Sequence, residues 1–137
     1  MATRSLIGMK KPDGRIQVIY CHWDGYPEYV GLQLLLNYRD DETVQKLMDL
    51  GDRSSLRGAP TEEDTYAVTQ STKIVPTIYN DFQQFLDNDK GGTEYFYLWD
   101  NGWDIYAVSF DNTVTLLGRI TNYKVTIEKP DMESNTR

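Results

Sequence analysis

Two short segments near the start of the chain, at positions 5–11 and 15–21, are rich in apolar and β-branched residues. A Pro-Asp-Gly sequence separates them and is typical of a tight turn, so the pattern predicts a β-hairpin. Apolar residues occupy both faces of the second segment, with Ile16 and Val18 on one face and Ile19 on the other. This strand is therefore expected inside a sheet that is covered on both sides.

Helical spacing of apolar residues follows in the next part of the chain. Residues 27–37 begin with a proline, which suits a first helical turn, and continue with a run of leucines. A second short helix is expected after Asp40 or Asp41, either of which can cap it, and Gly51 stands where this helix ends. Its inner face is expected to carry Val44, Leu47 and Met48.

Apolar spacings of three and four residues return after Pro76 and predict a third helix that ends near Asp89. The residues that carry this spacing are Ile78, Tyr79, Phe82, Phe85 and Leu86. The segment at 65–75 fits either a strand or a helix.

The strongest strand signal lies at residues 95–110, where two aromatic-rich segments flank an Asn-Gly dipeptide. This dipeptide is typical of a two-residue hairpin turn, which pairs Asp100 with Trp103. In that register one face of the hairpin is aromatic. It carries Tyr95, Tyr97, Trp99 and Tyr106.

Further strands are expected at residues 113–117 and 123–127. The order of elements, with strands, then helices, then strands joined by tight turns, indicates an α+β fold. We expect a mainly antiparallel twisted sheet of about five to six strands with two or three helices packed on one face. The length suits one domain, residues 1–128, and the polar residues 129–137 are expected to form a disordered tail.

The composition supports a folded chain and excludes several classes of protein. Of the 137 residues, 39% are apolar and 12% are aromatic, unlike the composition of disordered chains. The net charge of −7 argues against general nucleic-acid binding and against binding to anionic membranes. One cysteine excludes an intramolecular disulfide, and neither a membrane-spanning apolar run nor a signal peptide is apparent. We expect a soluble intracellular protein.

The charge is unevenly distributed along the chain. Residues 1–26 hold four basic and two acidic side chains, whereas the remaining residues hold ten basic and nineteen acidic ones. The same first segment contains the single histidine, His22, and the single cysteine, Cys21. A discrete site for an anionic ligand is therefore most favourable in this segment.

Two catalytic or metal-binding interpretations of this segment are weak. Cys21 and His22 are adjacent on a strand and point to opposite faces, which disfavours a nucleophile and its base. A zinc site lacks a second histidine or cysteine to complete it, so no metal and no cofactor is predicted.

A binding site for an anionic or nucleotide-like ligand is the favoured functional interpretation. The rings of Trp23 and Tyr26 offer flat faces, and Arg4 supplies positive charge. The candidate ligand-binding residues are Thr3, Arg4, Ser5, His22, Trp23, Asp24 and Tyr26. A structural alternative stays open, in which the two rings fill the junction between sheet and helix.

The aromatic face of the late hairpin is comparable to the base-stacking surfaces of single-stranded nucleic-acid binders. Such surfaces add basic residues, whereas this one is surrounded by Glu94, Asp100, Asp104 and Asp111. We therefore predict no general nucleic-acid binding. The interface candidates Tyr95, Tyr97, Trp99 and Tyr106 are expected to be covered in part by the third helix and in part by a second copy in a homodimer.

Two acidic runs, at residues 40–42 and 62–64, are expected to cap helices or to face solvent. If they gather on one surface, they could imitate a phosphate backbone and occupy the nucleic-acid-binding groove of another protein. The phosphate-binding loops, nucleophile elbows and zinc-protease motifs of common enzymes do not occur in the sequence.

The N-terminal Thr-Arg-Ser at residues 3–5 and the Tyr-Cys-His-Trp-Asp-Gly-Tyr-Pro segment at 20–27, followed by Gly31 and leucines, resemble a family of small uncharacterised phage and prophage proteins. Residues 50–56 extend the similarity, which covers roughly the first 56 residues. The resemblance implies a virus or mobile-element setting, in which small acidic accessory proteins often act by binding. It implies no catalytic residues.

Three functional expectations follow, in order of preference. The first is a phage accessory protein in the host cytoplasm that acts by non-catalytic binding and sequesters a small nucleotide-derived signal of host defence. The second is a protein–protein inhibitor of a host defence enzyme, such as a nuclease, that acts through an acidic or aromatic surface. The third is an enzyme that uses His22 and Asp24 as acid and base.

Overall fold

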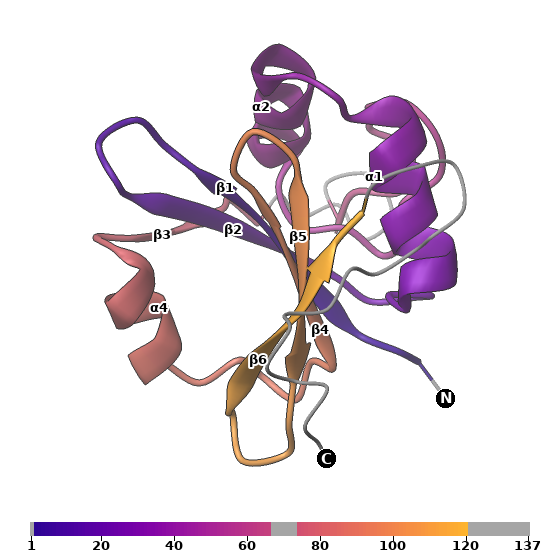
Figure 1. Ribbon diagram of the computed structural model, residues 1–137. Coiled ribbons are helices and arrows are strands. Elements are labelled where there is room, and N and C mark those ends of the chain that lie inside the picture. The colour runs from indigo at the N-terminus through magenta and orange to yellow at the C-terminus, as the bar shows by residue number, and fades with distance from the viewer. Residues whose placement is uncertain (1, 67–73, 121–137) are drawn as a thin grey trace.

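The computed structural model of the chain describes residues 2–66 and 74–120 (Figure 1). Its strands are β1 (Ser5–Lys10), β2 (Ile16–Cys21), β3 (Thr77–Tyr79), β4 (Tyr95–Trp99), β5 (Trp103–Val108) and β6 (Val114–Arg119). Its helices are a π-helical turn η1 (Pro27–Gly31) that continues into α1 (Leu32–Asn37), then α2 (Asp41–Leu50) and α4 (Phe82–Asp87). The expected strand at 123–127, the tail at 129–137 and most of the segment 65–75 lie outside the described residues.

The six strands form one mixed sheet in the order β3-β2-β1-β4-β5-β6. All neighbouring pairs are antiparallel except β1 and β4, which run parallel at the centre. This parallel pair follows from the long connection between β2 and β4, which passes through the helices and β3 before it returns. The α+β class, the strand number and the mainly antiparallel sheet are confirmed.

The helices divide between the two faces of the sheet, which corrects the expectation that they share one face (Figure 1). The first face carries Ile7, Ile19 and Tyr97 and forms the larger core cluster with residues of α1 and α2. On the opposite face α4 packs Phe85 against Phe96, with ring centroids 4.3 Å apart. A second helical layer is needed because β2 is apolar on both faces.

Local sequence signals account for the first two helical segments. Residues 27–37 form the predicted helix, with a wider π turn at its start. The side chain of Asp40 caps α2 by accepting a hydrogen bond from the Thr43 backbone N–H at 2.8 Å. The predicted inner face of α2, Val44, Leu47 and Met48, is fully buried.

In the described part of the chain, no helix has the length and apolarity to cross a membrane.

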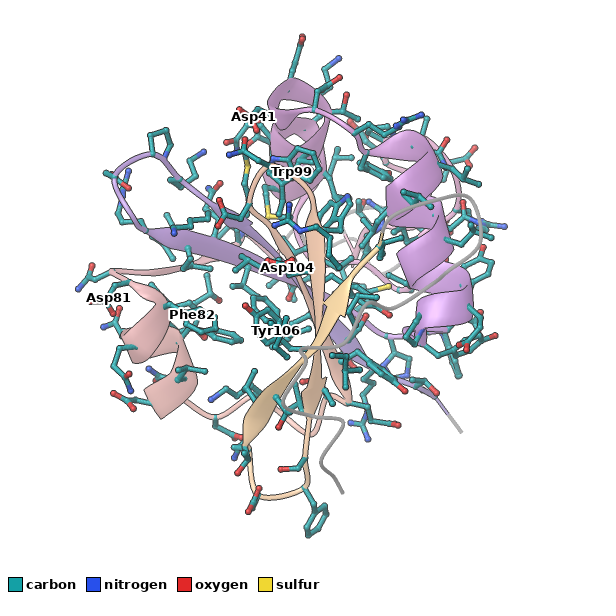
Figure 2. All side chains as sticks on the ribbon, viewed as in Figure 1. Asp41, Asp81, Phe82, Trp99, Asp104 and Tyr106 are labelled. Carbon is teal, nitrogen blue, oxygen red and sulfur yellow. The ribbon has the colours of Figure 1, made fainter. Side chains whose placement is uncertain are left out.

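The third helix is shorter than its apolar spacing predicts, because residues 77–79 pair with β2 as the edge strand β3. Asp81 then caps α4, since its side chain accepts a hydrogen bond from the backbone N–H three residues on, at 2.8 Å. Figure 2 shows Phe82 directed from α4 toward Tyr106 of β5. Over so few residues, the spacing of apolar positions does not separate a strand followed by a helix from one longer helix.

The β4–β5 hairpin has a register one residue away from the predicted one. Trp99 pairs with Trp103, so the turn has three residues instead of two. Its Asn and Gly both adopt positive φ, as these residue types allow. Because a shift of one position moves side chains to the other face, Tyr106 lies on the α4 side, opposite Tyr95 and Tyr97. The predicted four-residue aromatic face is therefore wrong.

Candidate functional site

The first residues of the chain, the end of β2 and the loop that leads into η1 meet at one place. The Gly25 backbone N–H donates to the Thr3 carbonyl oxygen at 2.8 Å and holds the loop against the N-terminal segment. A Cβ atom at Gly25 would lie 2.7 Å from the Cβ atom of Ser5, so this close contact requires glycine. The fold thus brings segment 3–5 next to residues 22–26, as the predicted site requires.

Four side chains form a row at this place, Arg4, Tyr20, His22 and Trp23, which we call the aromatic edge. The Tyr20 hydroxyl is hydrogen-bonded to Nδ1 of His22 at 2.7 Å. The His22 ring meets the Trp23 ring edge-on, with centroids 4.7 Å apart, and Trp23 is 47% exposed. Ser5 pairs with Cys21, so Arg4 lies next to His22 at this end of the two strands. Burial raises the pKa of Tyr20, and the positive charge of Arg4 opposes that rise.

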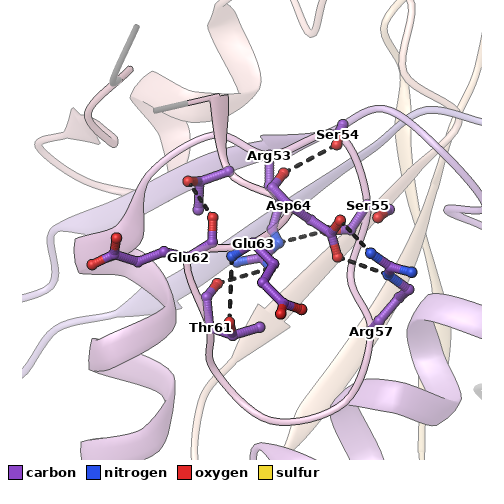
Figure 3. A network of polar contacts seen from close by, with 9 residues as sticks. Arg53, Ser54, Ser55, Arg57, Thr61, Glu62, Glu63 and Asp64 are labelled. Atoms are coloured by element: carbon purple, nitrogen blue, oxygen red, sulfur yellow. Dashed lines mark hydrogen bonds and ion pairs between the residues drawn. The ribbon is translucent and has the colours of Figure 1, made fainter. Parts of the chain in front are cut away.

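The loop of residues 52–65, whose internal polar contacts Figure 3 shows, fixes the backbone behind the aromatic edge. The His22 backbone N–H donates to the Arg53 carbonyl oxygen at 3.2 Å. The Trp23 backbone N–H donates to the Ser54 carbonyl oxygen at 2.8 Å. The backbone that carries these rings is therefore held in place by the fold itself, so a ligand bound there would not have to order it.

Arg53 anchors this loop and is fully buried, a role that no pattern in the sequence indicates. Its Nε donates to the Ser55 carbonyl oxygen at 2.6 Å, and its Nη2 donates to the Thr61 carbonyl oxygen at 3.3 Å. Arg57 binds the Asp64 carboxylate through hydrogen bonds of 2.8 and 2.7 Å, and this lowers the pKa of that carboxyl (Figure 3). The last residue of the second acidic run is thus neutralised within the loop and does not add to an acidic surface.

The remaining predicted ligand contacts differ in how far they can reach a ligand. Tyr26 and Asp24 are exposed, and the charge of Asp24 raises the pKa of the Tyr26 hydroxyl. An anion is therefore better placed toward Arg4 than toward this pair. Ser5 is fully buried, and its hydroxyl has no hydrogen-bond partner among the described residues. Ser5 packs against Gly25, so its side chain is not exposed to a ligand at the surface.

Cys21 has the environment of a core residue. Its side chain is fully buried, and its Sγ donates to the Trp23 carbonyl oxygen at 3.7 Å. Burial raises the pKa of the thiol to about 12. The thiolate that a nucleophile requires is therefore scarce near neutral pH.

We expect native Cys21 to resist alkylation by iodoacetamide at about pH 8, because the thiol is both protonated and buried. The same protein unfolded in guanidinium is expected to take up one equivalent, since an unfolded thiol ionises normally. Intact-mass spectrometry measures both states. If the native protein were alkylated as fast as the unfolded control, Cys21 would not be a buried, protonated thiol.

Two of the predicted interface candidates, Tyr97 and Trp99, belong to the core. Tyr97 is fully buried, and its hydroxyl donates to the Gly25 carbonyl oxygen at 2.6 Å, so it supports the loop of the aromatic edge from inside. Trp99 is 7% exposed, and its Nε1 donates to a carboxylate at the start of α2 at 2.7 Å. Tyr95 and Tyr106 are partly exposed but lie on opposite faces. The four residues therefore form neither one stacking surface nor one dimer contact.

Within residues 2–66 and 74–120, no three His, Cys, Asp or Glu side chains gather as a metal site requires. No family model, curated protein or solved structure matches the chain. The geometry of the aromatic edge therefore carries the functional conclusion.

Proposed function

We propose that this protein is a non-catalytic binder of a small, anionic, nucleotide-derived ligand, held at the aromatic edge. The observation that carries the proposal is Trp23, whose ring is nearly half exposed while its backbone is fixed by the loop of residues 52–65. An exposed indole stacks on a base, and a neighbouring guanidinium pairs with phosphate. Arg4 supplies that guanidinium.

The charges around the site support an anionic ligand. Arg4 is exposed, and no carboxylate of the described residues forms an ion pair with it. Lys10, Arg15, Arg57 and Arg119 are each paired with an aspartate. Lys11, Arg39, Lys46 and Lys90 form no ion pair among the described residues either, so what favours Arg4 is its place beside the aromatic rings. In a protein of net charge −7, an arginine without an ion pair and beside exposed rings is more favourable for a phosphate than the rest of the acidic surface.

The setting that we propose is a phage-infected host cell, in whose cytoplasm the protein sequesters a signal made by a defence system. This part of the proposal rests on the resemblance of residues 3–5 and 20–27 to phage and prophage proteins. Sequestration needs affinity without turnover, which suits a site of stacking rings and one cation.

We expect at least one member of a panel of cyclic dinucleotides, cyclic trinucleotides and ADP-ribose derivatives to bind with a change in tryptophan fluorescence. Replacing Arg4 by Gln is expected to weaken that binding about ten-fold, because a charge-assisted hydrogen bond to phosphate is lost. Trp23→Phe is expected to remove the fluorescence change, since Trp99 and Trp103 are buried. Isothermal titration calorimetry measures the affinity of each variant.

Arg15→Gln is the matched control, because it removes an exposed arginine that already pairs with Asp13 at 2.7 Å. This variant is expected to bind like the unaltered protein. No binding across the panel would remove the proposal, and so would an equal loss of affinity in the two arginine variants.

The enzymatic alternative requires His22 and Asp24 to act on a common substrate. Nδ1 of His22 is instead engaged by the Tyr20 hydroxyl, which is more consistent with a fixed ring than with a free base. Turnover of a panel nucleotide that disappears in His22→Ala would favour the enzyme over the binder.

A further inference from the structure

Two neighbouring cavities lie at the other end of β1, away from the aromatic edge. The first, of about 270 Å³, is lined by Asp41 and Trp99, and the second, of about 320 Å³, lies between α4 and the sheet. Lys10 and Asp100 line both, so the cavities adjoin each other at this pair. We call the second cavity the acidic groove.

The acidic groove has an apolar floor and aromatic walls. Ile16 and Leu98 are buried beneath it. Phe82 and Tyr106 stand beside it with ring centroids 5.7 Å apart, and both are only partly buried (Figure 2). Partly exposed rings of this kind attract cations to their faces, and Arg guanidinium groups more often than ammonium groups.

Three carboxylates line the groove together with one cation, Lys10. Asp81 caps α4, and Asp104 accepts a hydrogen bond from Nε of Arg119 at 2.8 Å. Asp100 is bound less firmly, because its pair with Lys10 spans 3.7 Å and both side chains are nearly half exposed. Exposed pairs of this kind contribute little, so Asp100 is free to exchange Lys10 for a better partner.

From this charge and shape we infer that the acidic groove binds an arginine side chain of a partner protein. The planar guanidinium stacks on an aromatic ring and forms two parallel hydrogen bonds to a carboxylate, here Asp100. A polypeptide is favoured over a free cation because the two cavities adjoin at Lys10 and Asp100, so a segment seated in the acidic groove can continue along the first cavity. This surface is separate from the aromatic edge, so either proposal can fail without the other.

The probe is an acetylated, amidated Gly-Arg-Gly-Arg-Gly peptide, titrated calorimetrically at low ionic strength against the full chain. We expect it to bind, and we expect Asp100→Asn to weaken binding about five-fold through loss of a charge-assisted contact. Phe82→Leu, which keeps the apolar packing and removes the ring, is expected to weaken binding to a similar degree. Lys10→Ala is expected to strengthen binding, because it frees Asp100.

Asp87→Asn is the matched control. Like Asp100→Asn it removes one negative charge, but Asp87 lies on α4 and does not line the groove. It is expected to alter the affinity less than about two-fold. An equal effect of Asp87→Asn and Asp100→Asn, weaker binding by Lys10→Ala, or no binding of the peptide would overturn the inference. If N-acetyl-arginine amide bound as tightly as the peptide, the inference that the partner is a polypeptide would be overturned.

Discussion

Replacing Arg53 by alanine is expected to lower the free energy of unfolding by about 4 kcal/mol. The guanidinium is fully buried and supplies the donors for the carbonyl oxygens of Ser55 and Thr61. Alanine leaves both acceptors without these donors and opens a cavity where the long side chain lay. Urea denaturation followed by circular dichroism measures the loss.

Two further variants separate the buried role of Arg53 from the loss of a positive charge. Arg15→Ala removes an exposed arginine and is expected to change stability by less than about 0.5 kcal/mol. Arg53→Lys keeps the charge but not the planar fork, so it is expected to recover only part of the stability. Equal stability of Arg53→Ala and Arg15→Ala would show that the loop does not depend on this side chain.

Replacing Gly51 by alanine is expected to destabilise the protein by about 3 kcal/mol, because the site combines a strained backbone with a steric clash. Gly51 has φ 83° and ψ −166°, a conformation that only glycine adopts easily. A Cβ atom there would lie 2.3 Å from the Ile74 carbonyl oxygen. That oxygen accepts a hydrogen bond from the Asp52 backbone N–H at 2.9 Å, so it cannot move aside freely.

Gly58→Ala isolates the backbone strain from the clash. Gly58 also has a positive φ, of 68°, but a Cβ atom there would meet no heavy atom within 4 Å. Its replacement is expected to cost about 1 kcal/mol, the strain of a left-handed conformation alone. Thermal and urea denaturation measure the stability of both variants. Equal losses of stability in the two would contradict the clash at Gly51.

Local signals in the sequence predicted much of the fold. The Pro-Asp-Gly turn of the first hairpin, the Asp40 cap and the apolar face of α2 all appear where the residues placed them. Each depends on residues a few positions apart, whose interactions hardly change with the rest of the chain.

Long-range features could not be predicted in the same way. The parallel pairing of β1 with β4 and the placement of α4 on the second face depend on contacts between distant segments. The late hairpin differs by a single residue in its turn, yet that difference moves Tyr106 to the opposite face. Pattern alone does not distinguish a two-residue turn from a three-residue turn around Asn-Gly.

The candidate site shows the same division. Trp23 and Arg4 could be selected from the sequence because both lie in the mildly basic segment of residues 1–26. The supports of the site, Tyr97 and Arg53, lie far along the chain and reach it only through folding. A tyrosine at a buried strand position signals that its hydroxyl needs a partner, but an arginine in a loop of Ser and Gly carries no such signal.

The parallel pairing of β1 with β4 also determines the order in which the molecule can assemble. Ser5 pairs with Tyr95, about ninety residues away, whereas β1–β2 and β4–β5 each close through short turns. The two hairpins are therefore expected to form early and to join late. Tyr97 reaches the Gly25 loop only once they have joined, so this contact beneath the candidate site cannot form in a nascent chain until β4 has left the ribosome.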